Sequence, residues 1–167
     1  MLVMYSIVST ADRRDLAAIT AWWRWEAFFR GGQRSFDDVL SGAQQTAKQA
    51  PSMPRTFVLL ADNEPIGTAS LAACDLEERP DLTPWLAGVY IVPQARGQGH
   101  AARLIAAVEN HSAALGMPVL WLYTNSAERI YARAGWKTVE SVQHNGKPFA
   151  LMRRDLCESA PSPSNAA

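Results

Sequence analysis

The sequence predicts one α+β domain with a mixed, mostly antiparallel central sheet and helices on both faces of that sheet. Three observations predict this fold. Hydrophobic residues make up 48% of the 167 residues, which is enough to bury a core. Hairpin patterns at residues 56–74 and 136–153 predict antiparallel strands. Between them, apolar runs alternate with helical periodicity, which is typical of strands joined by helical crossovers.

Each predicted element follows from a local pattern and ends at a turn signal. Apolar runs between turn residues predict strands, and apolar residues three to four positions apart predict helices. Gly31-Gly32 ends the first helix, and Asn145-Gly146 predicts a tight hairpin because its residues readily take positive φ angles. In chain order we expect a strand within residues 1–8, a helix from about 12 to 30, a helix from 35 to about 50, strands at 56–61, 66–74 and 86–92, a helix from about 99 to 115, a strand at 119–123, a helix at 127–134, and strands at 136–142 and 149–153.

Composition and charge narrow the functional classes. Lys+Arg and Asp+Glu both total 16, so the formal net charge is zero and does not favour general binding of nucleic acid. The sequence has no run of about 18 apolar residues that would predict a membrane span, and three scattered histidines do not give the spacing of a metal site. Two cysteines are too few for a disulfide framework and fit a reducing cytoplasm.

The domain boundaries also follow from composition. We expect one domain at residues 1–157 and a disordered, Pro-rich tail at residues 158–167. We expect Cys74 to be a small core residue. No internal repeat or linker divides the chain.

The segment from Val89 to Ala102 carries most of the functional information. An apolar strand ends at Pro93, a turn with two glycines follows, and a helix begins near residue 100. The first N–H groups of a helix have no partner within the helix, and the helix dipole adds partial positive charge there. Gly97 and Gly99 allow a ligand to approach the main chain closely. The turn therefore predicts a phosphate site.

This segment resembles the central signature of the GNAT family of N-acetyltransferases, whose Arg/Gln-x-x-Gly-x-Gly/Ala loop wraps the pyrophosphate of acetyl-CoA. The resemblance covers roughly residues 3–156 and is specific at residues 89–102 and 131–136. It implies the GNAT fold and direct transfer of acetyl from acetyl-CoA, as cosubstrate and without a metal, to a primary amine of a small acceptor. The residues that it assigns to acetyl-CoA are Tyr90, Ile91, Val92, Arg96, Gly97, Gln98, Gly99, His100, Ala101, Ala102 and Asn125.

Acyl transfer from a thioester to an amine needs a base for the amine, a donor for the developing oxyanion and an acid for the departing thiolate. The resemblance assigns the oxyanion donor to a main-chain N–H before Pro93, which itself cannot donate. Tyr131 lies in a segment similar to the family's Tyr-x-x-x-Gly-Phe/Trp element, where the phenol lies near the CoA sulfur. We therefore expect Tyr131 to be the acid, with simple packing of a helix on the sheet as the alternative.

Asn125 has two interpretations. In the family, an Asn at the start of this helix often contacts the cofactor. Here Asn125 precedes Tyr131 by six residues, against seven in the family's common form. The alternative, which we favour, is a helix N-cap.

The general base is not evident from the sequence. No His, Asp or Glu lies between Thr83 and Val92, where some members of the family carry one. An acidic group at residues 75–81 comes just before this segment and could attract a cationic amine. We expect a water chain ending at Asp81 to serve as the base, with a solvated acidic loop as the alternative.

Glu26 lies in the middle of an apolar stripe on the first predicted helix. A carboxylate among aromatic side chains is costly unless it is paired, and such conflicts are expected at functional sites. The first two helices line the acceptor pocket in the family, so we expect Glu26 and the indoles of Trp22 or Trp25 to contact a cationic acceptor. The alternative is an ion pair between Glu26 and Arg30. Trp85 is a further candidate for the pocket wall, with a core position as its alternative.

Two other functional classes are weighed against this one. Residues 97–102 also fit the Gly-x-Gly-x-x-Ala motif of dinucleotide-binding folds, but they do not follow the first strand and no acid ends the next strand. The sequence therefore disfavours a dehydrogenase relative to an acetyltransferase. The chain could also bind acetyl-CoA as a sensing or interaction module without turnover. The acceptor, the use of acyl groups other than acetyl, and the oligomeric state, a dimer included, stay open.

Overall fold

A computed structural model describes residues 2–49 and 52–156. Within these residues, strands form one mixed sheet of seven in the order β1-β2-β3-β4-β5-β7-β6, which confirms the predicted fold class. The expected disordered tail at 158–167 lies outside the described residues. The strands are β1 (Tyr5–Ser9), β2 (Arg55–Ala61), β3 (Glu64–Ala72), β4 (Trp85–Ile91), β5 (Val119–Thr124), β6 (Lys137–His144) and β7 (Lys147–Asp155).

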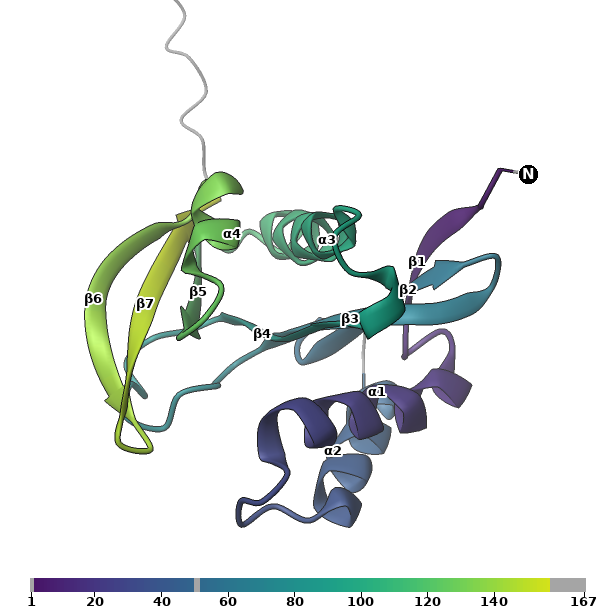
Figure 1. The fold of residues 1–167 in the computed structure, drawn as a ribbon, viewed down its shortest axis with the longest axis horizontal. Helices are drawn as coiled ribbons and strands as arrows, with labels where there is room; N and C mark the ends of the chain where they lie inside the picture. Colours follow the sequence, from purple (N-terminus) through teal and green to yellow (C-terminus); the bar gives the residue numbers. More distant parts are fainter. Residues whose placement is uncertain (1, 50–51, 157–167) are drawn as a thin grey trace, which may run out of the picture.

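Helices cover both faces of the sheet, as expected. Helices α1 (Ala17–Arg24) and α2 (Phe36–Lys48) pack together on one face, and α3 (His100–Ala114) and α4 (Glu128–Arg133) lie on the other (Figure 1). The main core cluster joins the sheet to α3 and includes Leu59, Leu71, Leu104, Ile105 and Val108. A second cluster between α1 and α2 consists mainly of alanines, whose small side chains let the two helices approach closely.

Strands β4 and β5 separate soon after they meet. They are parallel neighbours, yet within the described residues they share a single residue pair, Trp85 with Trp121. The backbone N–H of Trp121 also donates to the Pro84 carbonyl at 3.0 Å. Because β4 continues to Ile91 and β5 to Thr124, the carboxyl-terminal parts of both strands have edges that do not pair with each other. We refer to the region between these two edges as the β4–β5 split.

A β-bulge in β4 lies where the split begins. Thr68 pairs with Tyr90 and Ser70 with Ala87, so two residues of β4, Gly88 and Val89, oppose one residue of β3. Gly88 has a φ of 61°. A Cβ atom on Gly88 would lie 2.8 Å from Arg24 Nε, so the bulge brings the Arg24 side chain of α1 against the backbone of β4.

The first predicted helix is interrupted. In place of one helix from about residue 12 to 30, the structure has a 3-10 turn at Arg14–Leu16, helix α1, and a π-helical turn at Trp25–Phe29. A π turn has a wider spacing than an α-helix and changes the direction of the side chains that follow. The buried residues of α1 are Ala17, Thr20, Ala21 and Trp23, and Glu26, which follows α1 in the π-helical turn, is exposed.

The prediction for Cys74 is wrong. Cys74 is a free, exposed cysteine. The reason is that β3 ends at Ala72, so Cys74 lies in the loop that leads to β4 and not on the buried part of the strand.

The bulge predicts opposite effects for two glycine substitutions. We expect Gly88→Ala to lower the free energy of unfolding by about 1–2 kcal/mol, because a residue with a Cβ is strained at positive φ. Gly42 lies within α2, where an added Cβ would meet no atom within 4 Å, so Gly42→Ala should raise stability by up to ~1 kcal/mol. Urea denaturation measures both values, and a stabilising Gly88→Ala would contradict the bulge.

Candidate active site

The predicted phosphate loop lies between the end of β4 and the start of α3. Pro93–Ala95 form a 3-10 turn, and Gly97 and Gly99 have φ angles of 75° and 79°. A Cβ on either glycine would meet no atom within 4 Å. The two glycines therefore serve the backbone conformation, and Arg96 to Gly99 leave their main chain exposed.

The first turn of α3 presents donors that no side chain caps. Gly99 is the N-cap residue and has no side chain that could accept from this turn. Ala101 and Ala102, the next helical residues after His100, are half-buried and exposed. Since the free N–H groups and the dipole of a helix start both favour an anion, this loop and turn fit a phosphate group.

His100 fixes the start of α3 to β1. Its side chain is buried, and its ring lies 4.9 Å from the ring of Tyr5. Within the described residues, His100 Nδ1 is buried without a hydrogen-bond partner. The side chain thus packs inward, and only the main chain of His100 faces the loop.

Arg96 folds back on the end of β4. Its Nε donates to the Ile91 carbonyl at 2.9 Å, and its Cζ lies 5.5 Å from the centroid of the Tyr90 ring. The Tyr90 ring also stacks on Trp23 of α1 at 5.6 Å. Arg96 and Trp23 therefore hold the end of β4, at Tyr90 and Ile91, in place.

Of the main-chain donors expected before Pro93, Val92 is already engaged. Val92 N donates to the Ile66 carbonyl at 2.9 Å, so the expectation that this N–H faces a ligand is wrong. Successive N–H groups of a strand point to opposite edges. Since Val92 N points toward β3, the Ile91 N–H points toward the β4–β5 split.

Tyr131 lies on α4, on the same face of the sheet as α3 (Figure 1). Its ring packs edge-on against Trp136 at 6.1 Å, and Trp136 Nε1 donates to Glu109 of α3 at 2.9 Å. Burial raises the pKa of the Tyr131 phenol to about 12, so this phenol carries its proton at neutral pH. Tyr131 also packs against the main core cluster, so the packing role that we weighed as an alternative is present as well.

The N-cap interpretation of Asn125 is wrong. The N-cap residue of α4 is Ala127, and Thr124 Oγ1 accepts hydrogen bonds from Ser126 N at 3.4 Å and Ala127 N at 3.1 Å. Thr124 thus holds the turn that leads into α4, and no side chain caps the first turn of this helix. Asn125 is exposed and lines a cavity of about 290 Å³ with Glu128 of α4 and residues of β6 and β7.

Glu26 forms the ion pair that we weighed as its alternative. Arg30 Nη1 lies 2.6 Å from Glu26 Oε1, and both side chains are exposed. The buried, unpaired carboxylate that motivated an acceptor contact is therefore not present at Glu26. The π-helical turn is the physical reason, because Glu26 is its second residue.

The three tryptophans expected at the acceptor pocket differ in their exposure and in their contacts. Trp22 packs on Trp25 at 5.6 Å and on Phe36 of α2 at 5.4 Å, and it remains 43% exposed. The contact of Trp22 or Trp25 with an acceptor stays a prediction. Trp85 is fully buried, with Nε1 bonded to the Leu82 carbonyl at 2.8 Å, so the pocket-wall interpretation is wrong and the core position is confirmed.

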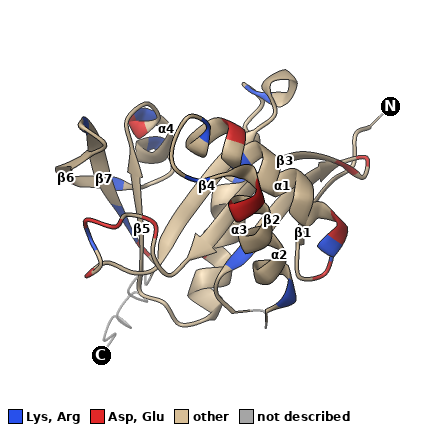
Figure 2. Ribbon diagram, turned by 90° about the horizontal axis from the view of Figure 1, so that it is seen from below, with Lys and Arg blue, Asp and Glu red and all other residues tan. Residues whose placement is uncertain are grey.

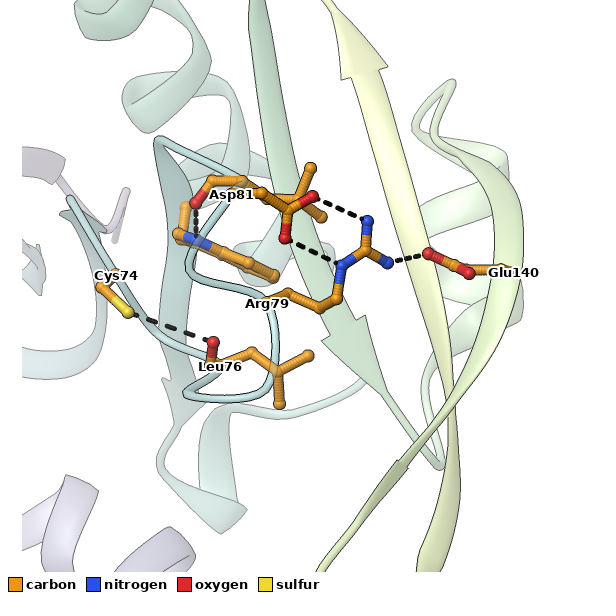
Figure 3. Close-up of polar contacts among 7 residues, drawn as sticks. Cys74, Leu76, Arg79, Asp81 and Glu140 are labelled. Carbon is orange, nitrogen blue, oxygen red and sulfur yellow. Dashed lines mark hydrogen bonds and ion pairs between the residues drawn. The ribbon is translucent and has the colours of Figure 1, made fainter.

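Asp81 is exposed on the loop between β3 and β4. Arg79 donates to both carboxylate oxygens of Asp81 at 3.0 Å and also pairs with Glu140 of β6 (Figure 3). The hydrogen bonds from Arg79 lower the pKa of Asp81 and make it a weaker base. Asp81 thus helps to tie the loop to β6.

The carboxyl group of Asp75, in the same loop, has its pKa shifted in the opposite direction from that of Asp81. The Tyr123 hydroxyl, at the end of β5, donates to the Asp75 main-chain carbonyl at 3.3 Å. Burial raises the pKa of the Asp75 carboxyl, and this effect outweighs the attraction of Arg24, His144 and Arg34, which lowers it. The sequence placed Asp75 in an acidic group but gave no signal that separated it from Asp81.

Arg24 faces Asp75 from the end of α1. Burial lowers the pKa of the Arg24 guanidinium, and the charge of Asp75 raises it. Among the described residues, Arg24 Nε is buried without a hydrogen-bond partner, and Arg24 and Asp75 form no ion pair within 4.0 Å. The sequence contained a signal that we missed, because Arg24 follows Ala17, Thr20 and Ala21 at helical spacing on the buried face.

The sequence was compared with protein families. The family model described as the acetyltransferase (GNAT) family matches residues 17–136. The chain belongs to the GNAT family of acetyltransferases. The match includes the phosphate loop and Tyr131, so the resemblance inferred from those two segments is confirmed. No curated protein matches the chain in sequence.

Solved structures share the GNAT fold over most of this chain. An N-acetyltransferase from Staphylococcus aureus Mu50 has 16% identity and a TM-score of 0.68, covering 94% of this chain and 100% of that one. The yncA protein from Salmonella typhimurium, solved with acetyl-CoA, has 15% identity and a TM-score of 0.66, covering 98% and 99%. The aminoglycoside N-acetyltransferase AAC(6')-Iy, solved with CoA, has 21% identity and a TM-score of 0.70, covering 88% and 97%.

In the view of Figure 2, both acidic and basic residues are scattered over several elements of the GNAT domain. Within residues 2–49 and 52–156, no group of three or more His, Cys, Asp or Glu side chains is arranged to hold a metal ion. In the same part of the chain, no helix has the length and apolar character needed to cross a membrane.

The two loop carboxylates predict different titrations in ¹³C carboxyl NMR. We expect Asp75 to titrate above the ordinary aspartate value of about 3.9 and Asp81 below it. Arg24→Met should raise the pKa of Asp75 further, because the lost guanidinium favoured the carboxylate, and should leave Asp81 unchanged. An Asp75 pKa below the ordinary value would contradict the buried setting.

Proposed function

We propose that the protein transfers an acetyl group directly from acetyl-CoA to a primary amine of a small acceptor. One observation carries this proposal: the β4–β5 split opens between an uncapped helix start and the protonated phenol of Tyr131. Membership of the GNAT family supports the acetyl transfer. The acetyl-CoA and CoA held by the yncA protein and by AAC(6')-Iy support the choice of donor.

Different main-chain groups beside the β4–β5 split would bind different parts of acetyl-CoA. The main chain of Arg96 to Ala102 would hold the pyrophosphate, because Gly97 to Gly99 are exposed and no side chain caps the first turn of α3. The Ile91 N–H would donate to the acetyl oxygen, since it points toward the split. One aligned donor of this kind is worth roughly 3–4 kcal/mol of transition-state stabilisation.

Two side chains would move the protons, one from each face of the sheet. An alkyl amine with a pKa near about 10.4 is protonated at pH 7, so Asp75 would accept one proton from the ammonium. The freed nitrogen would form the new C–N bond, the C–S bond would break, and the Tyr131 phenol would protonate the departing thiolate. The acylated nitrogen would release its remaining extra proton to the Tyr131 phenolate, which restores the phenol, and Asp75 would return its proton to water. Asp75 replaces Asp81 as the proposed base because the raised pKa of Asp75 makes it the stronger proton acceptor.

The loop can be tested with two glycines at opposite ends of α3. Gly99 and Gly116 both have a φ of 79°, and an added Cβ meets no atom within 4 Å at either site. We expect Gly99→Ala to weaken the binding of acetyl-CoA by about tenfold or more, because the strained loop re-aims its N–H groups. Gly116→Ala should carry a similar cost in stability and bind normally in calorimetry. Equal affinities for the two variants would contradict the loop assignment.

Tyr131→Phe tests the chemistry. We expect kcat to fall by roughly 10²-fold or more at unchanged affinity for acetyl-CoA, because the ring that packs on Trp136 remains and only the proton donor is lost. Thiol release across a panel of amines, followed at several pH values, measures this effect. Unchanged turnover at every pH would remove the acid role. Binding of acetyl-CoA by the wild-type protein without turnover of any amine would favour the sensing module instead.

A further inference from the structure

Arg24 is a cation without a protein partner at the start of the β4–β5 split. Its Nε is buried, and within the described residues no side chain or carbonyl accepts a hydrogen bond from it. Leaving this buried N–H group without an acceptor is costly. The Gly88 bulge holds Arg24 in this place, because the space a Cβ would take at Gly88 is filled by the guanidinium group.

Asp75 is the matching anion. The Asp75 carboxylate accepts no hydrogen bond from any described residue, and the loop that carries it is held by the Tyr123 hydroxyl. A nearby carboxylate, Glu78, is engaged by His144 at 2.9 Å. Asp75 is therefore a carboxylate of this loop that has no hydrogen-bond or ion-pair partner among the described residues and lies near Arg24.

Arg24 and Asp75 affect each other's pKa but do not close into an ion pair within 4.0 Å. Both are restrained from other sides, Arg24 by the bulge and Asp75 by Tyr123. Two opposite charges held near each other and left unpaired are complementary to a ligand that carries both an ammonium and a carboxylate.

A second cation favours such a ligand over a plain cation. Arg34 lies close enough to act on both Arg24 and Asp75, and among the described residues it forms no ion pair and lies over the Phe29 ring at 5.2 Å. Glu26 is paired to Arg30, whereas Arg24, Arg34 and Asp75 have no ion-pair partner within the described residues. A polyamine would meet repulsion from the two guanidiniums, whereas a carboxylate on the acceptor is attracted to them.

We propose that the acceptor is an amine that carries a carboxylate next to its amino group, as an α-amino acid does. Arg24 binds the carboxylate, and Asp75 receives the ammonium at the point where the split begins. The proposal rests on the proposed function, because it names the acceptor of that transfer. It assigns to Arg24 a role in specificity and adds no chemical step.

The test compares each amino acid with the amine that lacks only its carboxylate. Suitable pairs are L-leucine with 3-methylbutylamine, L-methionine with 3-(methylthio)propylamine and L-phenylalanine with phenethylamine, each assayed for thiol release from acetyl-CoA. We expect kcat/KM for the amino acid to exceed that for its amine by tenfold or more in at least one pair. Arg24→Met should remove this preference by raising KM for the amino acid. Its effect on the pKa of Asp75 should change the rates of both members of a pair alike, so the ratio of their kcat/KM values is the quantity to compare.

Three further variants separate specificity from structure. Arg24→Lys keeps the charge without the planar fork and should retain part of the preference. Arg30→Met, which breaks only the exposed pair with Glu26, should leave every rate unchanged. Asp75→Asn should lower the rates for both members of a pair, because both carry the ammonium.

Each outcome decides between the two proposals. Wild-type rates that are equal for both members of every pair, or higher for the amines, would overturn the acceptor class and leave the proposed function intact. If no compound is acetylated, the proposed function fails for these acceptors, and calorimetry in the presence of CoA tests the site directly. Binding of an amino acid that is lost in Arg24→Met supports the site, and no binding by the wild-type protein overturns it.

Discussion

The separation of β4 from β5 after a single residue pair is the constraint on which the rest of the site depends. A parallel pair that closed along its whole length would satisfy the main-chain groups of both strands and leave no free edge between them. Trp85 and Trp121 form the closed end, and Trp85 is fully buried there. The bulge at Gly88 then bends β4. The phosphate loop, the Ile91 N–H, Arg24 and Tyr123 all take their positions from this divergence.

Burial raises the pKa of a proposed acid on one face of the sheet and of a proposed base on the other. On the face of α3 and α4, burial alone raises the pKa of Tyr131 to about 12, so the phenol holds its proton more tightly than a free tyrosine does. On the face of α1 and α2, burial raises the pKa of Asp75 against the pull of three nearby cationic or basic groups, which leaves a carboxylate that is a better proton acceptor than Asp81. Asp75 and Asp81 belong to one loop, yet the hydrogen bonds from Arg79 give Asp81 the opposite shift. Their difference comes entirely from their neighbours.

Two errors in the sequence interpretation come from the limits and phase of helices. Asn125 was expected to cap α4, but α4 begins later, with Ala127 as its N-cap residue. Glu26 was expected to lie among buried aromatic residues, but a π-helical turn moves it to the surface beside Arg30. Arg24, at the end of α1, lies against the backbone of β4 at Gly88, a contact between distant elements that helical periodicity does not indicate. The start of α4 and the π-helical turn thus changed which side chains lie where the sequence pattern placed them.

The sequence by itself determined the order of the elements, the glycine loop before α3, the Asn145-Gly146 hairpin and the Tyr131 segment. These features depend on the φ preferences and periodicity of residues that are neighbours in the chain, and positive φ angles at Gly97, Gly99, Asn145 and Gly146 bear this out. Only the tertiary structure decided where β4 leaves β5, which loop carboxylate is buried and which cation faces it. Those properties depend on contacts between distant parts of the chain, such as Arg24 with Gly88 and Tyr123 with Asp75. Local preferences carry no information about such contacts, because burial and the nearest charge are set by whichever elements the fold packs together.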